Sequence, residues 1–591
     1  MYYGMTRSRL VCSFILLVIL VSMMAWLVTK QHALQLIEHG IVLDTDGYVH
    51  LLRLRSIIEH GGWNQGFIER DNAPWGFHMH WSKPFDLIIL AVAAPFLIIG
   101  YDSDQILLLV GGFSGPVFLV ALGMTLLWAV KPVLCPNGRL AFAALFGTSI
   151  ALFSYGSIGR VDHHILSLIP VAAALGGVIR QGFARHPKLH PSTYSLFTGL
   201  CCAVALWISV ETTAAITLVL GLAFLIRVEE SGRRPLWPIG VALPISSGLF
   251  ILIDPPSTGF LAPDIDRISI VSVGYGVALL CSMIVTDLLV QHLPRGWSLR
   301  FLVLLSGTAS ASSWLMTFPA VIAGPESIMG PELTRIWWNN IQELQPIRQT
   351  ADFSAYVGLS SLAAVGCLTG AGISAKHRKL FLYAAAASLA TTVLALNHIR
   401  FYTYSVTTGA IICALLIGRL SVVRRCRSPI MVVNGLIVLI IANMAMVVAP
   451  AIIFPKTKNM VACDILSIVP FLETLNAGSP DIIMTTPGYA PEILWRTHHG
   501  TVAGPYQRNI EGLRDVYQFF GSADDDEAKA IMSRRGSHYV LVCADRNLAD
   551  DGRHGLALLE KLRNGNEPRW LDEIPLSEAT LSGFRLYRVA D

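Results

Sequence analysis

The sequence predicts a polytopic α-helical membrane protein with about 13 transmembrane helices, followed by a small C-terminal α/β domain. Of its 591 residues, 53% are hydrophobic and only 14% are charged, whereas soluble domains contain about 25% charged residues. Apolar runs long enough to cross a bilayer recur throughout residues 1–452. Residues 453–591 are more polar and have the length of a domain.

Each predicted span is an apolar run of near-membrane length. The first follows Arg7 and Arg9 as a signal peptide would, but no small-residue cleavage site comes after it, so we expect a retained helix. Residues 87–100 are apolar but short, and we assign them to an interfacial helix. The predicted spans are 8–29, 105–130, 140–156, 164–181, 193–210, 212–227, 236–253, 270–290, 300–321, 352–371, 379–396, 402–418 and 429–452.

The distribution of basic residues gives the orientation. With the N-terminus in the cytoplasm, clusters such as 233–234, 376–379 and 424–427 fall in inner loops, as the positive-inside rule requires. Counting 87–100 as a full span would move every later cluster outside. The long loops 30–86 and 322–351 and the C-terminal domain are therefore predicted on the outer face.

The C-terminal domain shows its own pattern of strands and helices. Residues 481–486 and 538–543 read as short buried strands, and 584–589 alternate as a final strand. Residues 523–532 read as a helix with an acidic first turn. Cys463 and Cys543 also lie here, and we expect two buried free thiols rather than a disulfide.

Two kinds of partner or site are disfavoured by composition. The net charge is only +4 and no basic block is present, so no nucleic-acid partner is expected. The ten cysteines form no C-x-x-C pair, which disfavours a cysteine zinc site.

The first candidate motif is D-T-D-G-Y, residues 44–48, in the first outer loop. Asp44 either caps the following helix or joins a site, and Asp46 is the stronger candidate for chemistry. Farther along the loop, 70–86 are dense in aromatic, histidine and acidic residues, with His80 as a secondary candidate.

The second motif is G-R-V-D-H-H, residues 159–164, at an outer helix end. Asp162 offers an oxygen ligand and His163 and His164 offer imidazoles, a set that suits Mg²⁺ or Mn²⁺ or a direct phosphate contact. On a helix, adjacent side chains point about 100° apart. We therefore expect Asp162 to act with His164, or His163 alone, beside Arg160.

Three further outer-face residues are candidates. Glu211 stands at a tight turn, where capping the next helix is the alternative. Glu343 lies in the aromatic loop 322–351. Arg400 is placed to grip a phosphate, with snorkelling as the alternative. Arg267, by contrast, is expected to pair with the neighbouring acids of its own D-I-D-R segment.

The order of these motifs resembles the GT-C class of membrane glycosyltransferases, and within it the catalytic subunit of oligosaccharyltransferase and its bacterial relatives. That family has thirteen spans, a catalytic first outer loop and a C-terminal domain on the same face. Asp46-Gly47-Tyr48 is similar to its Asp-Pro-aromatic segment, and Trp75-Gly76 to its W-x-P-x-G segment. Asp162-His163-His164 stands where the family has Asp-x-Glu, residues 341–346 resemble its Glu-x-x-Pro segment, and Arg400 stands at its phosphate-binding arginine.

Two features depart from the family pattern. Histidines replace the second acid, and the Trp-Trp-Asp motif that binds the Asn-x-Ser/Thr acceptor is missing from the C-terminal domain; Trp337-Trp338-Asn339 lies in a different loop. The resemblance implies transfer of a sugar or oligosaccharide from a polyprenyl phosphate or pyrophosphate to a glycan, lipid or protein acceptor, at the outer face of a bacterial-type inner membrane.

The resemblance also implies roles for the candidate residues. Asp46 would bind metal or act as base, Asp162 and His164 would complete a site for Mg²⁺ or Mn²⁺, Glu343 would close over it, and Arg400, Arg160 and His163 would hold the donor phosphate. The alternatives are a transporter or flippase of lipid-linked sugars, whose charges should lie near the bilayer midplane, and a non-catalytic relative that binds a glycan lipid.

Overall fold

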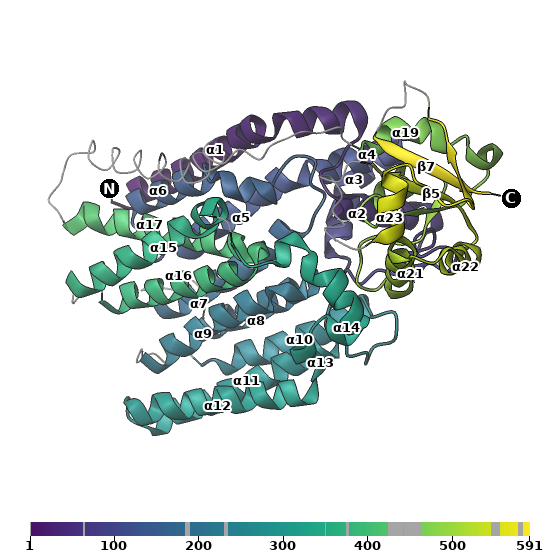
Figure 1. Ribbon diagram of the computed structural model, residues 1–591. Helices are drawn as coiled ribbons and strands as arrows, with labels where there is room; N and C mark the ends of the chain where they lie inside the picture. The colour runs from purple at the N-terminus through teal and green to yellow at the C-terminus, as the bar shows by residue number, and fades with distance from the viewer. Residues whose placement is uncertain are drawn as a thin grey trace.

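The structure is a computed structural model that describes residues 2–62, 66–183, 190–229, 235–348, 350–373, 378–423, 441, 463–544, 556–576 and 583–590. A bundle of long helices lies side by side, and the mixed C-terminal domain sits at one end of it (Figure 1). The helices of the bundle are α1 (Tyr2–His39), α4 (Ser103–Gly112), α5 (Ser114–Val130), α6 (Pro136–Gly147), α7 (His164–Phe183), α8 (Pro191–Ile208), α9 (Thr213–Glu229), α10 (Trp237–Ile253), α11 (Ile270–His292), α12 (Trp297–Thr317), α15 (Thr350–Ile373), α16 (Arg378–Asn397) and α17 (Tyr402–Val423).

Within the described residues, nine helical stretches are long and apolar enough to cross a membrane. Three shorter apolar helices include residues 192–208 and 237–253, which coincide with predicted spans, and Pro84–Ile99, which is α3 and coincides with the predicted interfacial helix. The chain is therefore a multi-pass membrane protein. The predicted span 429–452 lies outside the described residues except for Ile441, so the total of thirteen stays a prediction.

Two predicted spans are less regular than the sequence indicated. The run 105–130 is two helices, α4 and α5, that meet at Phe113. Just before this break, a Cβ on Gly111 would come within 2.9 Å of Val161, and one on Gly112 within 2.3 Å of Leu36. The run 140–156 is the short helix α6 followed by a 3₁₀ turn at Ile150–Ser154.

The first outer loop contains α2 (Thr45–His60), a two-residue hairpin of β1 (Phe67–Ile68) and β2 (Phe77–His78), and the start of α3. Helix α2 begins where the Asp44 carboxylate accepts a hydrogen bond from the backbone N of Gly47, at 2.9 Å. It ends at Gly61, whose φ of 62° is the left-handed conformation that favours glycine at a helix end.

The C-terminal domain is a five-stranded mixed sheet with flanking helices. Its strand order is β4-β3-β5-β7-β6, with β3 parallel to β4 and β5, and β7 antiparallel to β5 and β6. Strands occur at all three predicted positions. The elements are α19 (Ile465–Leu472), β3 (Ile482–Thr485), α20 (Ala490–Arg496), β4 (Gly500–Thr501), α21 (Ile510–Gly521), α22 (Asp525–Arg535), β5 (Ser537–Cys543), α23 (Ala557–Arg563), β6 (Leu571–Ile574) and β7 (Phe584–Val589).

The expectation of two free thiols in this domain is wrong. Cys463 and Cys543 form a disulfide with their Cα atoms 5.8 Å apart. Cys543 ends β5, and Cys463 immediately precedes α19, which packs on the same face of the sheet. Because the two cysteines are 80 residues apart in the sequence, no local pattern indicated that they lie close together.

The first outer loop is joined to the C-terminal domain through buried polar contacts. The Arg70 guanidinium donates to the carbonyl oxygens of Leu494, Thr497 and His499 at 2.7–2.9 Å. The buried Asp71 carboxylate accepts from the backbone N of Gly504 at 2.8 Å. These contacts hold the loop and the domain together as one cap on the end of the bundle.

The late outer loop completes this cap. It comprises α13 (Ala320–Ala323), α14 (Glu326–Ile336) and two 3₁₀ turns, η3 (Trp338–Asn340) and η4 (Gln342–Leu344). Met329, Leu333 and Trp337 are buried in one apolar cluster with residues of α21 and β5. The loop thus lies against the C-terminal domain, and its η4 turn returns to the bundle.

Candidate active site

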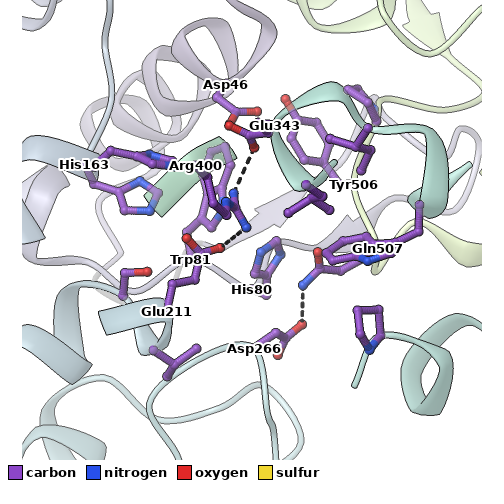
Figure 2. A pocket seen from close by; sticks show the side chains of 18 of the residues that line it. Asp46, His80, Trp81, His163, Glu211, Asp266, Glu343, Arg400, Tyr506 and Gln507 are labelled. Atoms are coloured by element: carbon purple, nitrogen blue, oxygen red, sulfur yellow. Dashed lines mark hydrogen bonds and ion pairs between the residues drawn. The ribbon is translucent and has the colours of Figure 1, made fainter. Parts of the chain in front are cut away.

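A cavity of about 1000 Å³ lies where the bundle, the first outer loop, the late outer loop and the C-terminal domain meet. Figure 2 shows the side chains of Asp46, His80, His163, Glu343 and Arg400 around it. Its wall in the bundle is mostly apolar or aromatic and includes Leu206, Ile208, Val271, Tyr275, Trp314 and Tyr356. Its opposite wall comes from the C-terminal domain and includes Pro487, Gly488, Tyr489, Pro505, Tyr506, Gln507 and Tyr517.

The two acids of the first motif have different surroundings. Asp44 caps α2 and also pairs with Arg160, whose Nε lies 3.0 Å from Asp44 Oδ2. Asp46, in the first turn of α2, lines the cavity and makes no hydrogen bond through its carboxylate within the described residues. Burial, and then repulsion from Asp44, Asp162 and Glu343, raises the pKa of Asp46 well above its usual value. Of the two acids, Asp46 is therefore the one whose carboxylate is held by neither a hydrogen bond nor an ion pair within the described residues.

The second motif is not helical where a helix was expected. Residues 161–163 form a loop, and α7 begins at His164. The loop lets Asp162 Oδ1 lie 2.6 Å from Nδ1 of His164 and 3.4 Å from Nδ1 of His163. The contact between Asp162 and His164 is the expected pairing, although it is formed by a loop rather than by a helix, and His163 lies farther from Asp162.

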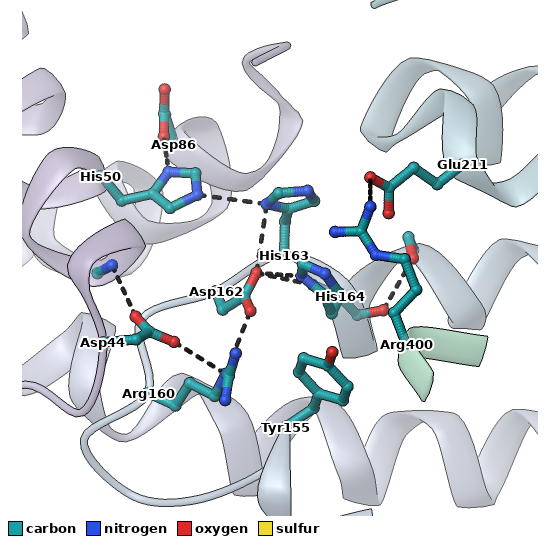
Figure 3. Close-up of polar contacts among 12 residues, drawn as sticks. Asp44, His50, Asp86, Tyr155, Arg160, Asp162, His163, His164, Glu211 and Arg400 are labelled. Carbon is teal, nitrogen blue, oxygen red and sulfur yellow. Dashed lines mark hydrogen bonds and ion pairs between the residues drawn. The ribbon is translucent and has the colours of Figure 1, made fainter. Parts of the chain in front are cut away.

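Asp162 lies beneath the cavity wall rather than in it. Its side chain is only 1% exposed, and Arg160 Nε lies 3.2 Å from Oδ2. Because the same guanidinium also reaches Asp44, Arg160 connects the two acidic motifs (Figure 3). His163 and His164 both line the cavity.

Arg400 is held between two acids instead of snorkelling. Nη1 lies 2.6 Å from Glu211 Oε1, and Nη2 lies 2.8 Å from Glu343 Oε1. Tyr155 donates from its hydroxyl to the other oxygen of Glu343 at 2.8 Å. Burial raises the pKa of Glu343, but the charges of Arg400 and His164 and the hydrogen bond from Tyr155 together outweigh this and lower it overall. The structure thus brings Arg400, Glu211 and Glu343 together at the cavity.

His80 also lines the cavity, next to Trp81, with their ring centroids 5.9 Å apart. Burial lowers the pKa of His80 to about 4. His50, which no sequence motif singled out, lies one helical turn after Asp46 and contacts His163. The i, i+4 spacing of Asp46 and His50 was the available signal.

The expected pairing of Arg267 within its own segment is wrong. Arg267 Nη2 lies 2.8 Å from Asp254 Oδ1. Asp264 and Asp266 pair instead with Arg508 of the C-terminal domain, at 2.7 and 2.6 Å. These ion pairs close one side of the cavity, and Gln507 beside them faces it.

Two sets of side chains are candidates for a divalent metal. In the described residues, His50, Asp162 and His163 each offer a ligand atom, and these three atoms lie within 4.8 Å of one another. The two imidazoles of this set already lie at hydrogen-bond distance from each other, 3.3 Å. His164 differs, because its Nδ1 is held by Asp162 while its buried Nε2 has no hydrogen-bond partner among the described residues.

This second arrangement fits a metal. A ligating histidine typically donates its other ring nitrogen to a carboxylate, as His164 does to Asp162. Asp46 interacts electrostatically with His164 and supplies an unsatisfied carboxylate. Carboxylate and imidazole together suit Mn²⁺ or Zn²⁺, and carboxylates suit Mg²⁺.

Comparisons with known proteins identify the fold. No family model matches the sequence, and no curated protein matches it by sequence. Among solved structures, the oligosaccharyltransferase AglB of Archaeoglobus fulgidus, in complex with an inhibitory peptide and a dolichol-phosphate, matches with a TM-score of 0.69 and 14% identity over 96% of this chain and 77% of that one.

Two other structures of the Archaeoglobus fulgidus enzyme agree. The apo form has a TM-score of 0.66 and 14% identity, covering 90% of this chain and 69% of that one. The complex with Zn and sulfate has a TM-score of 0.64 and 14% identity, covering 92% and 71%. The chain has the GT-C fold of the oligosaccharyltransferases.

Proposed function

We propose that this chain is a membrane glycosyltransferase that transfers a sugar or oligosaccharide from a polyprenyl phosphate or pyrophosphate to an acceptor at the outer face of a bacterial-type inner membrane. The observation that carries the proposal is the single cavity shared by Asp46, His164 and Arg400. A carboxylate that can act as a base or metal ligand, Asp46, and a cation that can bind phosphate, Arg400, thereby line the same cavity.

The walls of the cavity fit the two substrates. The apolar and aromatic bundle wall suits an isoprenyl chain, which a membrane protein can take up from the bilayer. The opposite wall, formed by the Thr486–Tyr489 and Pro505–Gln507 segments, is the proposed place of the acceptor. The solved AglB structure contains both a peptide and a dolichol-phosphate, which supports a two-substrate cavity of this kind.

The chemistry assigned to the residues is a displacement at the anomeric carbon. Burial raises the pKa of Asp46 and so makes its carboxylate a stronger base, and Asp46 would take the proton of the acceptor nucleophile. Arg400 would stabilise the charge that develops on the leaving phosphate. If Asp46 instead bound a metal together with His164, with Asp162 fixing the imidazole, that metal would supply further charge stabilisation.

To bind the leaving phosphate, Arg400 must give up one of its two ion pairs. Its two ion pairs, to Glu211 and Glu343, satisfy the guanidinium as it stands. Glu343 belongs to the late outer loop, so movement of that loop releases Nη2 to a phosphate oxygen. Glu343 is accordingly proposed as the residue that opens and closes the donor site, in line with its expected closing role.

The deletion strain of the source organism tests the proposal. Loss of a transferase leaves the lipid-linked sugar on the outer face, accessible to a glycosidase added to spheroplasts. Loss of a flippase leaves it on the cytoplasmic face, protected from the glycosidase until the membrane is permeabilised. The proposal predicts accumulation of glycosidase-accessible lipid-linked sugar, and a protected pool would overturn it in favour of the flippase.

A further inference from the structure

A polar subsite lies where the bundle side of the cavity meets the C-terminal domain. His80 comes from the first outer loop, Asp266 from the segment between α10 and α11, and Gln507 from the segment between β4 and α21. All three line the same cavity as Arg400 (Figure 2). Because Gln507 is hydrogen-bonded to Asp266, it stands where the proposed acceptor wall meets the bundle side.

His80 is buried in this subsite without a hydrogen bond. The residue is only 9% exposed, and neither ring nitrogen has a hydrogen-bond partner among the described residues. A buried polar group of this kind is costly unless a water or a ligand completes it. Burial lowers the pKa of His80 to about 4, so the imidazole is neutral at neutral pH. Since Nδ1 is inaccessible, Nε2 is the nitrogen that a molecule in the cavity can reach.

The orientation of the Gln507 amide is determined by Asp266. Nε2 of Gln507 lies 3.1 Å from Oδ2 of Asp266, whose carboxylate is also paired with Arg508. An ionised carboxylate only accepts hydrogen bonds, so the amide must turn its NH₂ group toward Asp266. Its Oε1 makes no hydrogen bond in the part of the chain that the structure describes. Gln507 thus offers the cavity a hydrogen-bond acceptor in a fixed orientation.

Both arginines next to this subsite are already neutralised. Arg508 Nη2 lies 2.7 Å from Asp264 Oδ2 and 2.6 Å from Asp266 Oδ1, and Arg267 Nη2 lies 2.8 Å from Asp254 Oδ1. With two carboxylates on one of these guanidinium groups and a neutral imidazole beside them, the subsite does not attract an anion. A phosphate is therefore better placed at Arg400, and the subsite suits an uncharged polar group.

Aromatic surface lies beside the polar atoms. Trp81 follows His80 and Tyr506 precedes Gln507, both rings line the cavity, and their centroids are 5.5 Å apart in an edge-to-face arrangement. A sugar ring has C–H groups on its faces and hydroxyl groups around its edge. It is therefore matched by aromatic rings next to a few fixed hydrogen-bonding atoms.

We propose that His80 and Gln507 bind hydroxyl groups of the sugar that is transferred, through Nε2 of His80 and Oε1 of Gln507. The inference rests on the proposed function, in which the sugar lies between the phosphate at Arg400 and the acceptor wall. Asp266 is a positioning residue in this account, because it acts on the sugar only through the amide of Gln507.

Two ligands that both carry an isoprenyl phosphate but differ in the sugar test the subsite. One is the lipid-linked sugar extracted from the deletion strain, and the other is farnesyl phosphate, which has no sugar. Both Kd values are measured on the full chain in detergent, without acceptor. We expect His80→Phe and Gln507→Met each to raise the Kd of the lipid-linked sugar roughly five-fold or more, as loss of one hydrogen bond does. The Kd of farnesyl phosphate should stay within about two-fold.

The variants separate binding from folding. His80→Phe keeps a ring at this position and breaks no hydrogen bond among the described residues, because neither nitrogen of His80 makes one there. The matched control is Gln518→Met, which makes the same change as Gln507→Met at an exposed position of α21. It should leave both Kd values unchanged.

The outcomes distinguish the subsite from the proposed function. If wild type binds both ligands and the variants bind the lipid-linked sugar as tightly as wild type does, the subsite is overturned while the donor site stands. An equal loss for both ligands would also overturn it, because the substitutions would then act on the shape of the cavity and not on the sugar. If wild type does not bind the lipid-linked sugar at all, the proposed function fails and the subsite fails with it.

Discussion

Nδ1 of His164 lies 2.6 Å from Oδ1 of Asp162, and this contact determines which atom His164 can offer to the cavity. Nδ1–H of His164 donates to this carboxylate, so in the neutral imidazole Nε2 carries the lone pair. Since Nε2 is buried and has no hydrogen-bond partner in the described part of the chain, the arrangement is that of an oriented metal ligand.

Removing this ligand should abolish binding of a divalent metal. We expect His164→Ala and Asp46→Ala to lose Mn²⁺ binding, measured by isothermal titration calorimetry on the purified chain in detergent. His50→Leu is the matched control, because it removes an imidazole that contacts His163 instead. Binding that survives His164→Ala but disappears in His50→Leu would move the metal to the buried set of His50, Asp162 and His163.

Arg400→Lys should impair transfer even though it keeps the positive charge. Lysine lacks the planar fork that lets Arg400 hold two oxygens at once, and losing one donor to a developing charge costs about 10²–10³-fold in kcat. The measurement is the rate of release of polyprenyl phosphate from the lipid-linked donor. Arg585→Lys, an exposed pair with Glu573 on the C-terminal sheet, is the control and should retain the full rate. Equal rates for both variants would remove Arg400 from the donor site.

The Asp71 contact predicts a pH dependence of stability. Burial raises the pKa of Asp71 to about 6, although hydrogen bonds from Asn72 and Gly504 oppose this. The unfolded value is about 3.9, so the folded chain binds this proton more tightly. The contribution is fully present below about pH 4 and is lost as the pH rises to about 6, an effect on the order of 3 kcal/mol.

The Asp71→Asn variant isolates this group from the other carboxylates. Its amide oxygen can still accept from Gly504, but it has no ionisable proton. The difference in apparent unfolding temperature between variant and wild type, measured in detergent from pH 4 to pH 7, should therefore change between pH 4 and 6 and be flat above. A constant difference over the whole range would contradict the assignment.

Reduction of the disulfide should loosen the C-terminal domain. Cys463 and Cys543 close a loop of 80 residues, and a native disulfide of this kind typically contributes about 2–5 kcal/mol. We expect the Cys463→Ser, Cys543→Ser double variant to show faster proteolysis within residues 463–590 while the bundle stays intact, measured by peptide mass spectrometry. Cys201→Ser, at a buried free thiol in α8, is the control. Equal cleavage of all three proteins would show that the disulfide does not stabilise the domain.

The elements that the sequence predicted best are those with a local cause. Apolar length predicts the helices of the bundle, alternation predicts β7, and a side-chain oxygen before a helix predicts the Asp44 cap. The order of acidic motifs predicted the GT-C fold, and the structure brings residues of both motifs to one cavity.

The remaining features depend on contacts distant in sequence. Arg508 takes the acids that Arg267 was expected to take, 242 and 244 residues away in sequence. Cys463 meets Cys543 only because β5 ends beside α19. His50 reads as an ordinary helix residue until α3 and the loop before α7 bring Asp86 and His163 against it. Local patterns contain no information on such pairings.

The most direct measurement of the central claim is mass spectrometry of the cell-envelope glycoconjugates in a deletion strain that carries either the wild-type chain or Asp46→Asn. Asp102→Asn, at the N-cap of α4, makes the same chemical change away from the cavity. We predict that wild type and Asp102→Asn restore the missing glycoconjugate, and that Asp46→Asn leaves it absent with the lipid-linked sugar accumulated. Full restoration by both Asp46→Asn and Asp162→Asn would contradict the account.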